Sequence, residues 1–206
     1  MAATAAEFAP MAAPLGPLRE GAIVLLSGPV AAGKTSLARE LVRRYGFRRL
    51  ATRDLILRRL PATYHTRSAM QRAGDRLDVE TGGGWVAHGL AAFMRRSRAN
   101  RIVIDSVRIA PQIDAIRSVA FGTVMHVHLT APLAVLATRY KAKGKAIQEL
   151  ASYSHVRRHP TEKRVHNLAT QADVLIDTSA VAPSKAASEV ALRLWPLSKE
   201  GGRRIN

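Results

Sequence analysis

The sequence predicts an α/β protein of three layers (α/β/α), in which helices cover both faces of a five-stranded parallel sheet. Short apolar runs alternate with segments of helical periodicity, as expected when each strand is buried on both faces and a helix leads to the next strand. A glycine-rich turn directly follows the first apolar run. At 206 residues, the chain is long enough for one domain with its own core.

The predicted strands are the apolar runs at 22–26, 102–104, 124–129 and 174–176, together with a short second strand at 47–51. Apolar residues at helical spacing predict helices at 37–45, 55–60, 66–81, 85–94, 111–119, 132–143 and 183–195. In the sixth of these helices, Leu133, Leu136 and Tyr140 fall on one side. Trp85 is expected in the core.

The domain is expected to span 20–197, between a disordered Ala/Pro-rich leader at 1–19 and a flexible tail at 198–206. The stretch at about 141–171 is polar and basic, so we expect a mobile lid rather than part of the core. No apolar run reaches the roughly 18 residues of a membrane span, and the leader lacks the features of a secretory or transit signal. The absence of Cys excludes disulfides and fits a reducing interior, so we expect a cytoplasmic protein.

The charge is strongly basic, with 32 Lys and Arg against 15 Asp and Glu, which gives a net charge of +17. A basic protein attracts polyanions, so nucleic acid is a possible partner beside small phosphorylated molecules. The arginines occur in scattered pairs rather than in one dense arm, and a solvated arginine-rich surface explains them equally well. The sequence gives no indication of the oligomeric state.

The turn after the first strand reads Gly-Pro-Val-Ala-Ala-Gly-Lys-Thr from Gly28 to Thr35. Two glycines at this spacing let the loop wrap oxyanions, with backbone N–H groups and the N-terminus of the next helix pointing at the phosphates. This P-loop pattern predicts ATP as the cofactor. The expected cofactor-binding residues in and after the loop are Gly28, Ala31, Ala32, Gly33, Lys34, Thr35 and Ser36.

Lys34 is expected to be catalytic because its ammonium reaches the β- and γ-phosphates. The Thr35 hydroxyl is expected to bind Mg²⁺. Asp105, at the end of the third strand, is the expected second metal ligand, since the carboxyl ends of parallel strands share one edge of the sheet. Otherwise Asp105 is only a turn residue.

Asp54 and Arg58 follow the second strand, and Arg108 follows the third. A phosphate acceptor needs a carboxylate beside its hydroxyl and cations beside its anionic group, so Asp54 is expected to be catalytic and to bind substrate together with these arginines. Arg72, on the polar face of the helix from residue 66, is a further substrate-binding candidate. Alternatively, Asp54 caps a helix that starts at residue 55.

Within the basic stretch, Arg139 and Arg157 are the candidates for contact with the transferred phosphoryl group, whose negative charge a closing cationic segment would stabilise. The histidines show no metal-binding pattern. His155 and His159 are expected at the surface. His126 and His128 alternate along the fourth strand, so we expect both on one side of the sheet, as core or edge residues.

With these residues in place, the chain resembles the nucleoside-monophosphate-kinase-like group of P-loop kinases, which includes adenylate, deoxynucleotide and dephospho-coenzyme A kinases. The resemblance covers about 22–195 and rests on the phosphate loop, on segments 52–58, 104–108 and 172–178, and on the basic stretch between the fourth and fifth strands. It implies that Thr178 and the residues after it pack beside adenine. Ser106 stands where the family usually has Gly.

The resulting hypothesis is an Mg²⁺- and ATP-dependent kinase that acts on a nucleotide or a similar small phosphorylated metabolite. A first alternative uses the same residues on a nucleic-acid end or on a modified base in DNA, which the basic charge favours. A second alternative is a non-catalytic ATP-binding module that regulates a partner.

Overall fold

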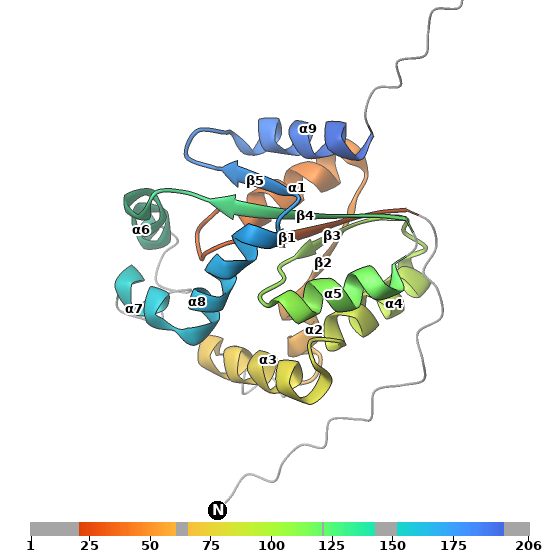
Figure 1. The fold of residues 1–206 in the computed structure, drawn as a ribbon, viewed down its shortest axis with the longest axis horizontal. Coiled ribbons are helices and arrows are strands. Elements are labelled where there is room, and N and C mark those ends of the chain that lie inside the picture. Colours follow the sequence, from red (N-terminus) through yellow and green to blue (C-terminus); the bar gives the residue numbers. More distant parts are fainter. Residues whose placement is uncertain (1–20, 61–65, 121, 143–151, 196–206) are drawn as a thin grey trace, which may run out of the picture.

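The computed structural model describes residues 21–60, 66–120, 122–142 and 152–195. Five parallel strands form one sheet in the order β2-β3-β1-β4-β5 (Figure 1). They are β1 Gly21–Ser27, β2 Arg48–Ala51, β3 Arg101–Asp105, β4 Gly122–Thr130 and β5 Val174–Asp177. The predicted five-stranded parallel sheet is therefore confirmed.

Helices connect the strands and cover both faces of the sheet (Figure 1). They are α1 Lys34–Tyr45, α2 Thr52–Leu57, α3 Arg67–Thr81, α4 Trp85–Ser97, α5 Ala110–Val119, α6 Leu133–Ala142, α7 Tyr153–Arg158, α8 Pro160–Asn167, the 3₁₀ helix η3 Leu168–Gln171 and α9 Pro183–Leu194. None of the helices in the described ranges is long and apolar enough to cross a bilayer.

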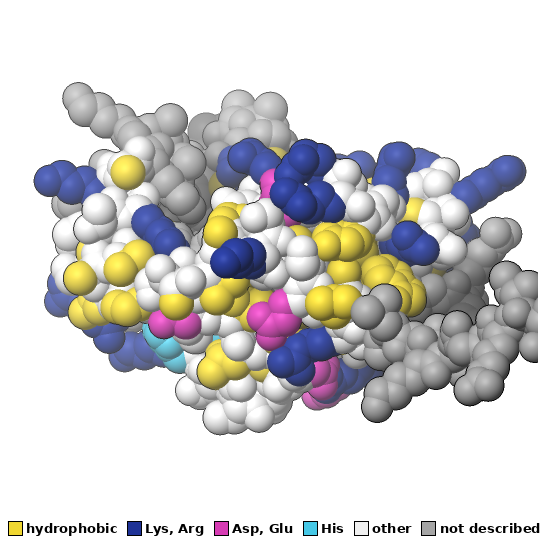
Figure 2. All heavy atoms as spheres, turned by 90° about the horizontal axis from the view of Figure 1, so that it is seen from above, with side chains coloured by type: hydrophobic (Ala, Val, Ile, Leu, Met, Phe, Trp, Pro, Cys, Tyr) yellow, Lys and Arg dark blue, Asp and Glu magenta, His cyan; other side chains and the backbone are white. Residues whose placement is uncertain are grey.

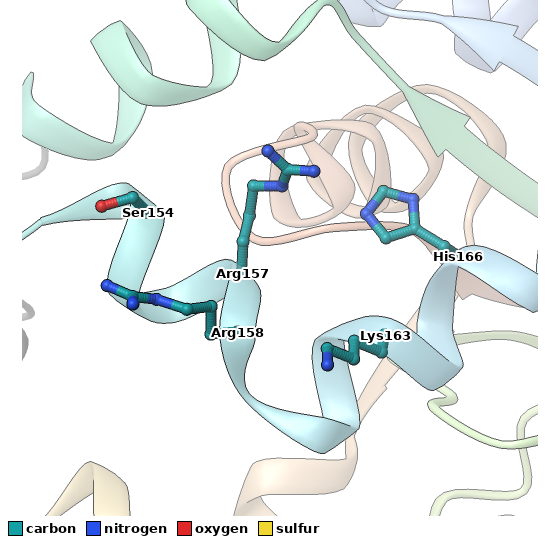
Figure 3. Close-up of a pocket in the computed structure, with 5 residues that line it drawn as sticks. All are labelled: Ser154, Arg157, Arg158, Lys163 and His166. Carbon is teal, nitrogen blue, oxygen red and sulfur yellow. The ribbon is translucent and has the colours of Figure 1, made fainter.

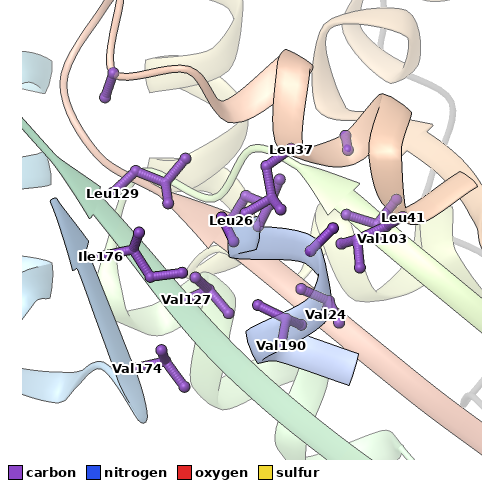
Figure 4. Packing of buried hydrophobic residues seen from close by; sticks show 14 of the residues in the cluster. Val24, Leu26, Leu37, Leu41, Val103, Val127, Leu129, Val174, Ile176 and Val190 are labelled. Atoms are coloured by element: carbon purple, nitrogen blue, oxygen red, sulfur yellow. The ribbon is translucent and has the colours of Figure 1, made fainter. Parts of the chain in front are cut away.

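The strands supply alternate residues to two separate hydrophobic clusters. Val24 and Leu26 of β1 point into a cluster with α1, α6, α7 and α9 (Figure 4). Ile23 and Leu25 point to the opposite face, into a cluster with α3, α4, α5 and η3. This period of two explains why β1 is a continuous apolar run.

Helix α1 is bounded at both ends by a glycine with positive φ. Gly33 at the N-cap has φ 94° and Gly46 at the C-cap has φ 68°, a region that L side chains rarely adopt. Gly46 therefore ends the helix where the sequence predicts.

Trp195, directly after α9, lies beside Phe47, with the ring centroids 5.9 Å apart. The guanidinium of Arg101 lies over the Trp195 ring, 4.7 Å from its centroid.

A hydrogen-bond network around Asp78 joins α3, α4 and α5 on the face of the sheet that carries the Ile23–Leu25 cluster. Asp78 of α3 accepts hydrogen bonds from Trp85 Nε1 and Gln112 Nε2, both at 2.7 Å. Trp85 is 2% exposed, as predicted for a core residue. Burial raises the pKa of Asp78, although the two hydrogen bonds act in the opposite direction.

One helix boundary was predicted wrongly, and one apolar helix residue is exposed. The helix expected from residue 55 begins at Thr52, because the Thr52 hydroxyl donates to the Ser106 carbonyl at 2.9 Å and turns the chain directly after β2. Asp54 therefore lies in the first turn of α2 rather than at its cap. Leu133 begins α6 with its side chain in solvent, 52% exposed, whereas Leu136 and Tyr140 are buried.

The described part of the expected lid contributes a few side chains to the core, where the sequence predicted none. Tyr153 and Val156 of α7 are buried in the first cluster, and Leu168 of η3 in the second. The predicted leader, the predicted tail and residues 143–151 lie outside the described residues.

Hydrogen bonds also join α8 to α3. Gln71 bonds to the ring of His159 at 2.5 Å, and Thr161 donates to Asp75 at 3.3 Å. His159 is half-buried and caps α8 by accepting from the Thr161 backbone N–H, so its predicted surface position is wrong, while His155 is exposed as expected. The sequence pattern did not reveal that a helix starts directly after His159.

Candidate active site

The phosphate loop joins β1 to α1 at the carboxyl edge of the sheet, where the predicted ligands meet. Gly28 has φ 129°, and a Cβ there would lie 2.3 Å from the Leu129 carbonyl oxygen. Only glycine fits this close approach between the loop and β4. The side chain of Thr178 lies near Gly33, 3.8 Å from the position of an added Cβ. The loop thus packs against the end of β4 and the residue that follows β5.

Lys34 is the first residue of α1, and its side chain folds back over the loop. Its Nζ donates to the carbonyl oxygens of Gly28 at 2.6 Å and Pro29 at 2.8 Å. Of the other predicted loop ligands, Ala31 and Ala32 are buried within the turn and Ser36 is exposed in the first turn of α1. The ammonium and the N-terminus of α1 therefore lie together, which suits a bound phosphate.

The two predicted metal ligands are in contact. Thr35 Oγ1 donates to Asp105 Oδ2 at 2.9 Å, because β1 and β3 are neighbours and both end at this edge. The Asp105 side chain is only 7% exposed. The same oxygen also accepts from Arg49 Nε at 3.0 Å and Arg49 Nη2 at 2.8 Å.

The oxygen atoms of Thr35 and Asp105 fit Mg²⁺, which prefers oxygen ligands and keeps several waters or substrate oxygens in its coordination shell. The described residues contain no group of three or more His, Asp or Glu that could hold a metal alone. A metal at Thr35 and Asp105 would therefore depend on phosphate and water oxygens for the rest of its shell.

Arg49 is a site residue that the sequence analysis missed. It lies in β2, and its register partner is Val103 of β3. A charged residue within a predicted buried strand was the available signal, but nothing in the local pattern indicates that its partner is Asp105.

The predicted acceptor residues lie around the same edge without forming one cluster. Asp54 and Arg58 are exposed on and after α2, and Arg72 is exposed on α3. Arg108 approaches Glu162 of α8, with 3.8 Å between Nη1 and Oε1. Within the described ranges, no ion pair joins Asp54 to an arginine.

Glu162 is a second residue that the sequence analysis missed, and it binds the phosphate loop. Its side chain is 5% exposed, and its Oε2 accepts from the Val30 backbone N–H at 3.1 Å. Tyr153 donates to the Val30 carbonyl at 3.3 Å. Because N–H and C=O of a trans peptide point in opposite directions, Glu162 and Lys34 lie on opposite sides of the peptide between Pro29 and Val30. Helices α7 and α8 thus grip the outer side of the loop.

A cavity of about 380 Å³ opens beside α7 and α8 (Figure 3). Its lining residues are Ser154, Arg157, Arg158, Lys163 and His166. Arg157 and His166 reach from the two helices toward one space, and neither helix places a carboxylate in the lining (Figure 3). The predicted residue Arg157 therefore belongs to a cationic cavity that suits an anion.

Arg139 lies in the last turn of α6. Its guanidinium donates to Thr178 Oγ1 and to the Thr178 carbonyl, both at 2.8 Å. It is therefore tied to the loop after β5, beside Gly33, and not to the α7–α8 cavity.

A buried chain of hydrogen bonds underlies the phosphate loop. Ser27 Oγ lies 2.7 Å from His126 Nε2 and 2.8 Å from His128 Nδ1. Both histidines are fully buried on one side of the sheet, as predicted. Burial lowers the pKa of both, that of His128 to about 4, with further lowering by His126, Lys34 and His166.

Solved structures share this fold at low sequence identity. TT1252 from Thermus thermophilus is 16% identical, with a TM-score of 0.54 over 85% of this chain and 99% of that one. Shikimate kinase from Acinetobacter baumannii, in complex with shikimate, is 17% identical, with a TM-score of 0.51 over 88% and 96%. No curated protein matches the chain in sequence.

The protein-family comparison covers the loop, the edge residues and α7. The model described as an AAA domain matches residues 24–158, which include Lys34, Thr35 and Asp105. The chain therefore belongs to the AAA domain family and has the fold of P-loop kinases.

Proposed function

We propose that the chain is an ATP-dependent kinase that transfers a phosphoryl group to a nucleotide or a similar small phosphorylated metabolite. One observation carries the proposal: the Thr35–Asp105 hydrogen bond of 2.9 Å brings a hydroxyl from the start of α1 and a carboxylate from the end of β3 together beside a lysine-bearing phosphate loop. Oxygen ligands at this position suit a metal bound to a nucleoside triphosphate. The shikimate kinase of similar fold supports phosphotransfer as the reaction class.

Different residues of the chain would bind the triphosphate, hold the metal and accept the proton of the acceptor. The loop N–H groups and Lys34 bind the triphosphate and neutralise charge on the transferred group. Mg²⁺, held through Thr35 and Asp105, would supply further charge neutralisation at the phosphates. Asp54 would accept the proton of the acceptor hydroxyl, which makes the attacking oxygen a better nucleophile.

Cationic side chains would bind the anionic parts of both substrates. Arg157 and the α7–α8 cavity suit a phosphate-bearing ligand, since four of the five lining residues are basic or imidazole side chains. Arg58, Arg72 and Arg108 are the candidates for the acceptor's anionic group. The bonding of Arg139 to Thr178 favours a role beside the nucleotide base rather than at the transferred phosphoryl group.

A panel of nucleotides, phosphorylated metabolites and oligonucleotides with radiolabelled ATP tests the proposal. We expect transfer to at least one small acceptor. Lys34→Ala should abolish it, whereas Lys185→Ala, an exposed change on α9, should not. Transfer only to oligonucleotides would favour the nucleic-acid alternative, and ATP binding without transfer to any member would favour a regulatory module.

The role of Asp54 is tested with a matched pair of substitutions. Asp54→Asn should lower kcat by about 10²- to 10⁴-fold, because the proton acceptor is lost while the side-chain size is kept. Asp114→Asn, an equally exposed change on α5, should leave kcat unchanged. Unchanged kinetics in Asp54→Asn would show that another group accepts the proton.

A further inference from the structure

Arg49 lies on the side of the Asp105 carboxylate where a metal would bind. The carboxylate oxygen that Thr35 contacts, Oδ2, also receives both N–H groups of the Arg49 fork, at 3.0 and 2.8 Å. A guanidinium usually spreads its two donors over two carboxylate oxygens. Here both converge on the one oxygen that lies beside the Thr35 hydroxyl, so the positive charge of Arg49 lies where a metal would approach.

Burial explains why Asp105 has such a partner. Its side chain is 7% exposed, and an unpaired carboxylate at that depth would be strongly destabilising. The Arg49 side chain is 37% exposed, so it can leave the carboxylate for solvent or another anion at little desolvation cost. The pair therefore joins a fixed anion to a cation that can be exchanged.

We infer that Arg49 is a counter-ion of Asp105 that keeps free divalent cations out of the site and gives way only when the metal arrives with a triphosphate. A free Mg²⁺ must approach against the charge of Arg49, whereas the net charge of an Mg²⁺–nucleotide complex is negative and is attracted by it. Arg49 is then a specificity-determining residue for the metal–nucleotide complex over the metal alone. The inference rests on the metal site of the proposed function, though not on phosphotransfer.

Mn²⁺ binding, measured as loss of the free-Mn²⁺ electron paramagnetic resonance signal, tests the inference with the full chain. Without nucleotide, Arg49→Met should bind Mn²⁺ about tenfold more tightly than the wild type, because one close positive charge is removed. Arg48→Met is the matched control, since it changes the net charge equally but precedes Arg49 in β2 and points to the other face. It should stay within about twofold of the wild type.

Two further measurements make the result decisive. Arg49→Lys keeps the positive charge and should bind Mn²⁺ as weakly as the wild type. This variant can be measured even if Arg49→Met folds poorly. With a non-hydrolysable ATP analogue present, the difference between Arg49→Met and the wild type should shrink to about twofold. Equal Mn²⁺ affinities in Arg49→Met and Arg48→Met, or tighter binding in Arg49→Lys, would overturn the inference.

These readouts need no turnover, so they separate the inference from the proposed kinase activity. If no acceptor is phosphorylated but Arg49→Met gains Mn²⁺ affinity, the counter-ion role stands and the kinase proposal fails. Asp105→Asn in the Arg49→Met background should remove the gain. A gain that persists there would place the metal elsewhere and overturn the inference.

Discussion

The hydrogen bonds of Ser27 determine which nitrogen of each neighbouring histidine carries a proton. His126 Nδ1 lies 3.2 Å from the Gln171 carbonyl, so this nitrogen donates and Nε2 accepts from the Ser27 hydroxyl. The Ser27 oxygen can then accept from His128 Nδ1. Both rings are neutral in this arrangement, which agrees with the lowered pKa values that burial produces.

Stability should therefore fall as the pH is lowered below neutrality. The pKa of His128 is about 4 in the folded protein against about 6.5 in the unfolded chain. The unfolded state binds a proton between these values and the native state does not, so the stabilising contribution is complete above about pH 6.5 and is lost toward pH 4. His128 alone accounts for up to about 3 kcal/mol of the free energy of unfolding, to be measured by urea denaturation at pH 7.5 and 4.5.

The substitution His128→Gln isolates this contribution. A glutamine amide can still donate to Ser27 but does not titrate in this range. The variant should show a smaller loss of stability between the two pH values than the wild type. An identical loss in both proteins would assign the pH dependence to other groups, such as His126.

At the scale of elements, apolar runs predicted β1, β3, β4 and β5, because strands covered by helices on both faces are mostly apolar. β2 is different, since Arg48 and Arg49 are exposed and only Leu50 and Ala51 are buried. Helix ends were predicted where glycine is required, as at Gly46. The helices and the core side chains of residues 152–171 were not predicted, because α7 and α8 are short and mostly polar, and only a few of their side chains reach the core. Their helical structure depends on contacts with distant segments, such as that between Glu162 and Val30.

The same distinction applies to the candidate site. Lys34, Thr35 and Asp105 were predictable because a local motif and the end of a strand fix their positions. Arg49 and Glu162 were not, because their roles arise from partners 56 and 132 residues away. A single sequence without such contacts does not distinguish these side chains from the many other charged residues.

The hydrogen-bond network around Asp78, which joins α3, α4 and α5, gives a prediction at this scale. Asp78→Ala removes the acceptor of two donors, Trp85 Nε1 and Gln112 Nε2, and should lower the free energy of unfolding by about 3 kcal/mol. Asp78→Asn keeps a carbonyl acceptor and loses a carboxylate whose burial is unfavourable, so its cost should be clearly smaller. Urea denaturation of both variants, with the exposed Asp114→Ala as control, tests this order.

At the scale of the whole molecule, the net charge is +17. On the face in Figure 2, the Lys and Arg side chains are dispersed among apolar and other polar side chains and do not form one dense patch. A nucleic-acid groove would concentrate them along a path that follows the phosphates. The face in Figure 2 shows no such path, which agrees with the small anionic substrates proposed above.

Oligonucleotide binding should therefore be weak and should involve few phosphate contacts. We expect a slope of log K against log salt concentration no steeper than about −3, which corresponds to about three to four neutralised phosphates on B-DNA. Fluorescence anisotropy of a labelled duplex between about 50 and 200 mM salt measures it. A slope near −6 or steeper would instead support a nucleic-acid substrate.

The contrast between the two tryptophans means that the protein carries its own optical reporters. Trp85 is 2% exposed and hydrogen-bonded to α3, whereas Trp195 is 39% exposed. Iodide, an anionic quencher, should be drawn to Trp195 by Arg101 and leave Trp85 emitting at short wavelength. The unquenched emission would then follow any movement of α3 when an acceptor binds, in the unlabelled protein.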